Sequence, residues 1–414
     1  MLLKCDVEPN SRDGLSCTPL ILASKNGHQQ VVQLLLHHNV DVDAHDNNGE
    51  TPLSFAVCSN HLTIAGMLLK SKANVDSRND HGFTPLLIAS QIGHQNLVQL
   101  LLANNADVRG CDNDGNAPLY LAVCAGHLEI ARMLLQCNAD VNSRNNRGFT
   151  PLLFASQNGH RDVVQLLLDH DADTDVRHDN GDTPLSLASH GGHREVSQML
   201  IKCNVDVNSG NDQGVTPLHL ASINGHLDIV QLLLDHKANV DAHDKWGNTP
   251  LSRAVFGGCI EVFRILLECN AEVNTRNNHG STPLLLASEF ATPDVVQFLL
   301  DNNADTDVRD GDGDTILHCA ALAGQLEVSR LLLKLDVDIN SRNNKGSTPL
   351  HLASAGYGGE GFPSFKNGYP DVVRLLLDHG ADAQACNLSG ETASEVARGP
   401  KREEIVQLLS RHCT

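Results

Sequence analysis

The chain has 414 residues, only 3% of them aromatic, and its 50 acidic residues outnumber its 30 basic residues to give a formal net charge of −20 at pH 7. This balance disfavours nucleic acids and anionic membranes as main partners, because both are bound through clustered lysine and arginine. The opening "MLLKCDVEPN" turns polar too early for a signal peptide, and the apolar runs are far too short to span a membrane. We expect an intracellular monomer, cytoplasmic or alternatively nuclear.

The tripeptide Thr-Pro-Leu recurs along the chain in steps of 33 residues or their multiples. A fixed period of this size indicates a stack of repeats, not several globular domains. The anchors are Thr18, Thr51, Thr84, Thr150, Thr183, Thr216, Thr249, Thr282 and Thr348, with the variants Ala117 and Thr315 in the same phase.

Each repeat predicts two helices and a returning loop, as "TPLHLASINGHLDIVQLLLDH" at 216–236 illustrates. Thr216 is a good N-cap residue, and Pro217 fits the first helical turn. Gly225 ends the first helix, and His226 begins the second. An alanine five residues after every anchor is small enough to let two helices approach closely. The loop returns as an extended arm, here called a finger, with glycine two residues before the next anchor.

The two ends of the chain depart from the repeat. Residues 1–17 form a partial unit, because "MLLKC" matches "MLIKC" at 199–203 and so begins within a second helix. This predicts a truncated chain or a longer natural parent. Residues 392–414 predict a solvent-facing cap, since charged residues replace apolar ones. Between them lie eleven units: 18–50, 51–83, 84–116, 117–149, 150–182, 183–215, 216–248, 249–281, 282–314, 315–347 and 348–391.

The unit resembles an ankyrin repeat, from "TPLHLA..NGH..IVQLLL......DV...D..G", over essentially the whole chain. The resemblance implies an all-α repeat solenoid, with helix-turn-helix units and β-hairpin fingers in a curved, elongated stack. It also implies that partners bind the concave side, formed by finger tips and the exposed ends of first helices. In this family, histidines at the positions of His219, His318 and His351 tie neighbouring units together by hydrogen bonds.

Alternate units resemble each other more than neighbours do, so a second period of 66 residues exists. One set of fingers is acidic, as at Asp112 and Asp310, whereas the other carries residues such as Arg147 or Lys345. Such a row matches a repeating ligand. Alternatively, opposite charges on adjacent fingers relieve repulsion, by about 0–1 kcal/mol per exposed pair.

Abundant cysteine and histidine follow from the repeat and indicate neither a metal site nor disulfides. Cysteines that share a register, such as Cys137 and Cys203, lie two units or roughly 20 Å apart, beyond the about 7 Å that a disulfide spans. Histidines spaced 33 residues apart are likewise too sparse to share a zinc ion. No nucleophile elbow or phosphate-binding loop is present, and "GYGGEG" at 356–361 is read as a flexible loop. We expect no enzyme and no cofactor.

Positions free of packing constraints predict the binding surface. These lie around the turn glycine and at the seventh and eighth residues after the anchor. The predicted partner-binding residues are His81, Gln91, Arg147, Gln157, Ile223, Lys245, Trp246, Arg253, Phe256, His279, Glu289 and Phe290.

Unit 249 stands out because it holds the only tryptophan and breaks the repeat pattern. Arg253 replaces an apolar residue, and the next unit has "EFATP" at 289–293 in place of "NGH". Trp246 is therefore either a partner anchor surrounded by these residues or a ring lying flat on its own finger. An eleven-residue insertion near 356–366 adds aromatics, and it is either a partner-specific lid, a mobile loop or an error in the coding sequence.

The sequence thus favours a non-enzymatic scaffold that binds a protein partner by shape and side-chain complementarity. The alternative is a recognition module of a larger signalling or sensor protein that is cut at its N-terminus.

Overall fold

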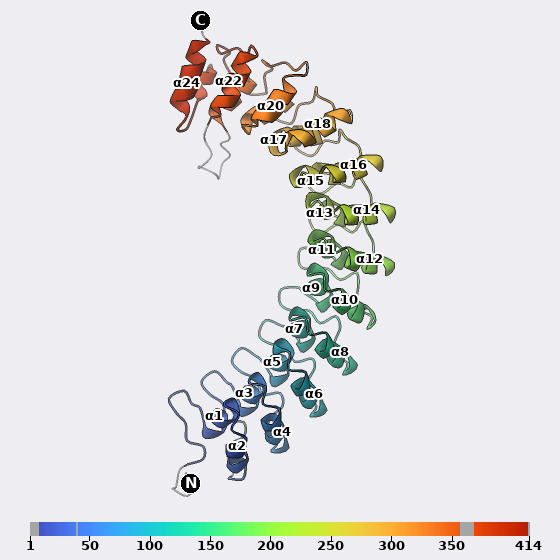
Figure 1. The fold of residues 1–414 in the computed structure, drawn as a ribbon, viewed down its shortest axis with the longest axis vertical. Coiled ribbons are helices and arrows are strands. Elements are labelled where there is room, and N and C mark those ends of the chain that lie inside the picture. Colours follow the sequence, from blue (N-terminus) through green and yellow to red (C-terminus); the bar gives the residue numbers. More distant parts are fainter. Residues whose placement is uncertain (1–7, 39, 357–367, 413–414) are drawn as a thin grey trace. The chain divides into compact units, whose positions relative to one another are not determined.

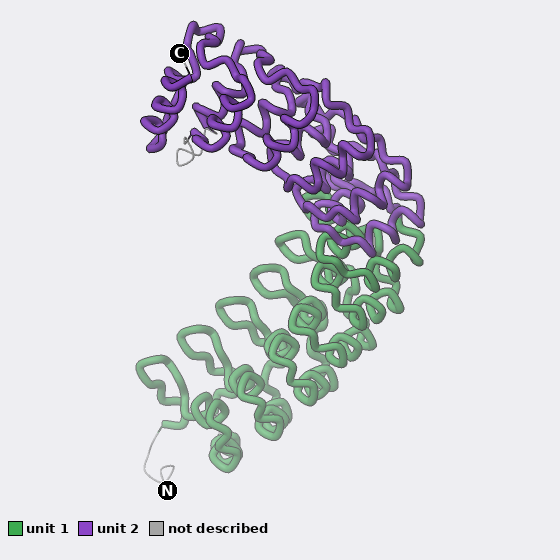
Figure 2. Tube along the Cα trace, turned by 45° about the horizontal axis from the view of Figure 1, so that its top comes forward, with its two compact units in different colours: residues 1–205 green, residues 206–414 purple. Residues whose placement is uncertain are grey.

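The computed structural model describes residues 8–38, 40–356 and 368–412. The chain forms two compact parts, which we call unit 1 (1–205) and unit 2 (206–414), as Figure 2 shows. A single repeat is named by its anchor, as in unit 249. In the described residues the regular secondary structure is helical, apart from an isolated bridge between Cys386 and Thr392. The prediction of an all-helical repeat protein is therefore confirmed.

Unit 1 consists of helix pairs stacked in chain order (Figure 1). The first helices of the pairs contact one another along one layer, and the second helices form the other layer. The helices are α1 (Pro19–Lys25), α2 (Gln29–Leu36), α3 (Pro52–Cys58), α4 (Leu62–Lys70), α5 (Pro85–Ile92), α6 (Gln95–Ala103), α7 (Pro118–Cys124), α8 (Leu128–Gln136), α9 (Pro151–Gln157), α10 (Arg161–Leu168), α11 (Pro184–Gly191) and α12 (Arg194–Lys202).

Unit 2 repeats the same two-layer arrangement and ends in the helix of the final unit, whose charged residues are exposed. Its helices are α13 (Pro217–Ile223), α14 (Leu227–Asp235), α15 (Pro250–Gly257), α16 (Ile260–Glu268), α17 (Pro283–Phe290), α18 (Pro293–Asp301), α19 (Ile316–Leu322), α20 (Leu326–Leu332), α21 (Pro349–Ala355), α22 (Pro370–Asp378), α23 (Ala393–Val396) and α24 (Arg402–Arg411).

The anchor tripeptide begins each first helix for a local reason. In unit 249, the Thr249 hydroxyl accepts the Ser252 N–H at 3.3 Å, and Pro250 occupies the first turn, where its missing N–H costs nothing. Leu251 and Ala254 then point into the core. Because Ala254 is so small, α15 packs closely against α13 and α17.

The fingers are tight polar hairpin turns closed by backbone bonds, as from the Asp244 N–H to the Asn248 carbonyl at 3.0 Å, and within the described residues they form no continuous strands. In the finger of unit 249, the Asp244 carboxylate accepts the backbone N–H groups of Trp246 and Asn248, both at 2.9 Å. These side-chain bonds occupy the donors that a strand ladder would use. The backbone turns at Gly247, which has φ of 77°. A Cβ atom there would lie 2.6 Å from the Asn278 side chain in the next finger, which explains the recurring glycine.

The 66-residue period corresponds to an alternation of acceptor and donor at the base of the fingers. The turn residue is asparagine in one set of fingers and aspartate in the other, where His178 is an exception, and only asparagine has an amide to donate. Asn277 Nδ2 donates to Asn248 Oδ1 in the preceding finger at 2.9 Å, and Asn343 Nδ2 donates to Asp314 Oδ1 at 2.7 Å. In unit 1, Asn145 Nδ2 donates to Asn116 Oδ1 in the same way, at 2.9 Å. These side-chain bonds add to backbone bonds that link successive fingers of both sets, such as Gly311 N–H to the His279 carbonyl at 2.7 Å.

Two predicted departures from the repeat lie wholly or largely outside the described residues. The start of the chain up to residue 7 and the insertion from 357 to 366 are not described. Beyond the insertion, Tyr369 takes the position that histidine holds in other units and begins α22, with its ring over Gly324.

Candidate functional site

The twelve predicted binding residues divide between the two units. Those in unit 1 are exposed at finger tips or at the ends of first helices: His81, Gln91, Arg147 and Gln157. Those in unit 2 are Ile223, Lys245, Trp246, Arg253, Phe256, His279, Glu289 and Phe290, of which Ile223, Arg253 and Glu289 are half-buried and the rest exposed. The contacts that bring predicted residues together are in unit 2.

Trp246 is held against its own unit by Arg253. The Arg253 guanidinium lies 5.3 Å from the indole ring, in cation–π geometry. The same guanidinium pairs with the fully buried Asp244 carboxylate, with Nε at 2.9 Å from Oδ2. Asp244 also holds the finger turn together. Arg253, which stands where other repeats have an apolar residue, thus links the Asp244 carboxylate to the Trp246 ring.

Phe256 and Phe290 form an exposed pair on neighbouring first helices. Their ring centroids are 5.4 Å apart and their planes are tilted by 39°. Each ring is 48% exposed. Phe256 lies near the end of α15 and Phe290 at the end of α17, so adjacent units contribute one aromatic side chain each.

Trp246 and Arg253 form one contacting pair and Phe256 and Phe290 another, and we call these four residues the aromatic row. Arg253 and Phe256 are three residues apart on α15 and therefore lie on the same side of that helix. Trp246 remains 43% exposed although it stacks on Arg253. Trp246 therefore stacks on a side chain of α15 and still presents apolar area to solvent, and its role as a partner anchor stays a prediction.

Glu289 borders the aromatic row with an unusual electrostatic environment. Burial raises the pKa of its carboxyl group to about 7, and the carboxylates of Asp310 and Asp314 in the next finger add to the rise. The pKa values of Asp310 and Asp314 are themselves raised, mainly by burial. A concentration of negative charge therefore adjoins an apolar surface.

Comparison with known families accounts for most of the chain. The pattern "Ankyrin repeats (3 copies)" matches residues 1–79, 72–145, 137–211, 200–277, 236–310 and 284–359, and "Ankyrin repeat" matches 345–388. The chain belongs to the ankyrin-repeat family. A comparison with curated proteins yields no match. Ankyrin repeats generally mediate protein–protein interactions.

The histidines of the ankyrin repeats act as structural links between units. Nε2 of His318 donates to the carbonyl of Ser347, the residue directly before the next anchor, at 3.0 Å, while Nδ1 bonds the anchor Thr315 at 2.8 Å. His219 and His351 make the equivalent bonds, as the resemblance implied. At the start of second helices, His193 Nε2 donates to the Gln157 carbonyl at 3.0 Å. These histidines are structural, as the repeat pattern predicted.

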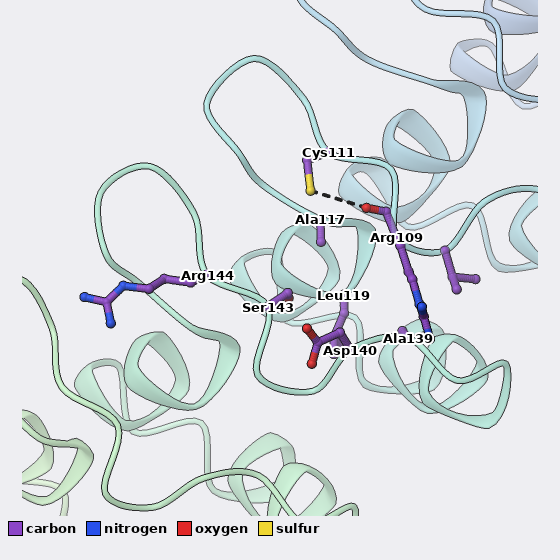
Figure 3. A pocket seen from close by; sticks show the side chains of 9 residues that line it. Arg109, Cys111, Ala117, Leu119, Ala139, Asp140, Ser143 and Arg144 are labelled. Carbon is purple, nitrogen blue, oxygen red and sulfur yellow. Dashed lines mark hydrogen bonds between the residues drawn. The ribbon is translucent and has the colours of Figure 1, made fainter.

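A cavity of about 500 Å³ in unit 1 lies away from the predicted residues. Figure 3 shows its lining, in which Cys111 Sγ donates to the Arg109 carbonyl at 3.4 Å. A corresponding cavity lies six repeats further along, around Thr306 and Ser341. The two cavities lie at equivalent positions of the repeat, so this cavity follows from the packing of neighbouring fingers. The cavity is lined by Val108, Arg109, Cys111, Ala117, Leu119, Ala139, Asp140, Ser143 and Arg144.

Two further findings concern the described part of the chain. Cys137, Cys203 and Cys269 are free thiols, in agreement with the spacing argument. Within the described ranges, no three His, Cys, Asp or Glu side chains are placed to hold a metal ion, and no helix has the length and apolar character needed to cross a bilayer.

Proposed function

We propose that this ankyrin-repeat chain is a non-enzymatic scaffold that binds a protein partner on the face formed by first helices and finger tips, with the aromatic row of unit 2 as the anchor. The observation that carries the proposal is the exposure of Trp246, Phe256 and Phe290 on neighbouring repeats of a chain with only 3% aromatic residues. Tryptophan and arginine are enriched among residues that dominate binding energy.

The construction of the row supports this role. Arg253 fixes the indole of Trp246 through an ion pair with buried Asp244. Phe256 and Phe290 restrain each other. A partner that binds such rings loses less conformational entropy than one that must order flexible side chains. Preorganisation therefore favours this patch over the mostly polar positions of unit 1, such as Gln91 and Gln157.

The net charge indicates the kind of partner, and the free cysteines indicate the compartment of the chain. A net charge of −20 favours a neutral or basic protein surface over nucleic acid or membrane. Free thiols on the surface, such as Cys137 and Cys203, agree with a reducing compartment, cytoplasmic or nuclear.

The proposal is tested by capture of partners from the native cell with the wild-type chain and a Trp246→Ala, Phe256→Ala variant. We expect the variant to lose a specific partner. Ile92→Ala is the matched control, because Ile92 occupies the position of Phe290 in a unit-1 repeat and is also exposed. A partner retained equally by all three proteins would refute the anchor.

The fluorescence of the single tryptophan supplies a second test. We expect emission of intermediate wavelength and acrylamide quenching in the free protein, because Trp246 is only partly covered. Binding of the captured partner should shift the emission to shorter wavelength and reduce quenching. A buried, unquenched indole in the free protein would remove the basis of the anchor.

A further inference from the structure

The end of α17 carries an acidic residue directly before Phe290, one member of the exposed aromatic pair. Glu289 and Phe290 are consecutive, and Phe290 contacts Phe256 across the boundary between units. Glu289 is half-buried, yet among the described residues its carboxylate has neither an ion-pair partner nor a hydrogen-bond partner. Its backbone carbonyl, by contrast, accepts from Gln325 Nε2 at 3.0 Å.

The next finger adds acidic groups to this region, and the cations that act on them, Arg309 and Lys345, lower the pKa of Asp314 without pairing with Glu289. The Asp310 carboxylate accepts the N–H groups of Asp312 and Asp314 at 3.0 and 2.8 Å. Arg309 is the nearest basic residue in the sequence, but its Nη1 already donates to the carbonyls of Gly313 and Arg342, at 2.9 and 2.8 Å.

We propose that the partner presents an arginine or lysine next to an apolar residue, so that the apolar group packs on Phe256 and Phe290 while the cation pairs with Glu289 in the field of Asp310 and Asp314. This inference rests on the proposed function and specifies the chemistry of the partner. A half-buried carboxylate without a partner gains most from a cation that arrives together with apolar cover, because the apolar contact excludes water from the pair. The face of Phe290 adds cation–π attraction.

Selection of peptides against the full chain provides the test. A library of random 12-residue peptides displayed on phage is selected on the immobilised protein, and the enriched peptides are synthesised. We expect an arginine or lysine adjacent to leucine, phenylalanine or another apolar residue. Binding should be lost with Phe256→Ala, which reports on the aromatic row itself.

The acidic contribution is measured with the same peptides. Glu289→Gln should weaken binding by about tenfold, and replacing the peptide arginine with uncharged citrulline should weaken binding to the wild type equally. The two changes combined should add little, since they remove the same pair. Glu261→Gln on α16 is the matched control, because it removes one exposed negative charge elsewhere in unit 249.

A pH series provides an independent readout. Asp310, Asp314 and the thiol of Cys319 face Glu289 from the next unit, and burial together with these carboxylates brings the pKa of Glu289 to about 7. Peptide affinity should therefore fall from pH 8 to pH 6 in the wild type and change little in Glu289→Gln.

The outcomes separate the two proposals. Peptides that need Phe256 but tolerate both Glu289→Gln and citrulline would overturn the cationic partner and leave the aromatic anchor intact. The same pH slope in wild type and Glu289→Gln would also overturn it. Failure to enrich any peptide that depends on Phe256 would overturn both.

Discussion

At the scale of single residues, two side chains of unit 2, Arg253 and His318, are satisfied by specific partners. Arg253 stands where other units have an apolar side chain, and it neutralises Asp244 and supports Trp246. His318 is fully buried, but both ring nitrogens are bonded. Buried polar groups are tolerated in these units because each bond links a finger to a helix or one unit to the next.

Arg253→Ala should destabilise unit 2 by about 1–3 kcal/mol, because it leaves the buried Asp244 carboxylate unpaired. The value is below that for a fully buried pair, since the Arg253 side chain is 21% exposed. Chemical denaturation followed by circular dichroism measures the change. Arg330→Ala, which breaks an exposed pair with Glu327, should have almost no effect. Equal losses in both variants would contradict this account.

The free energy of unfolding should fall as the pH is lowered, because His318 is buried in its neutral form. Burial lowers the pKa of His318 to about 4, against 6.5 for the ordinary side chain, so the unfolded state binds the proton more readily between these values. The free energy of unfolding should therefore decrease as pH falls from 6.5 to 4, by at most about 3 kcal/mol from this group. Denaturation of wild type and His318→Gln over this range measures it, and parallel pH curves would refute it.

At the scale of elements, the fingers are held by polar side chains as well as by the backbone. Side chains of Asp or Asn accept from the turn N–H groups, and a backbone bond such as Asn277 N–H to the Ser281 carbonyl, at 3.0 Å, closes each turn. The amide of the Asn fingers adds a bond to the preceding finger that the Asp fingers cannot donate. This difference gives the alternate fingers of the 66-residue period a structural role.

Asn277→Asp should lower stability by about 1 kcal/mol. The new carboxylate still accepts from the N–H groups of His279 and Ser281, but it loses the donor to Asn248 Oδ1 and places two acceptors together. Thermal unfolding measures the effect. The reverse change, Asp310→Asn, keeps its turn bonds and removes one of several adjacent acids, so stability should be unchanged or higher. A loss in Asp310→Asn would contradict this argument.

At the scale of the whole molecule, neighbouring repeats within each unit pack on one another, as the contacts between successive first and second helices show. Stability in such a stack is a sum of local and nearest-neighbour terms. A defect in one unit should therefore spread a short distance along the chain.

Leu251→Ala should lower hydrogen-exchange protection most in α13–α18 and least in α1–α6. Leu251 is fully buried, so the cavity costs about 2–5 kcal/mol. Leu53→Ala places the same change at the same position of a unit-1 repeat and should reverse the pattern. Uniform loss of protection along the chain in both variants would show that the two units unfold as one.

The residues alone specify the repeat and the helix pairs, because caps, periodic apolar residues and left-handed glycines act over a few neighbouring residues, whereas the linking histidines were implied by the resemblance to ankyrin repeats. The sequence also identified Trp246, Arg253, Phe256 and Phe290 as exceptions to the pattern. Three-dimensional packing was needed to show that Arg253 pairs with Asp244, that two phenylalanines from different repeats meet, and that Glu289 lies among the acids of the next finger. Those contacts join residues from different turns or units, and their distances depend on how helices and fingers pack in three dimensions.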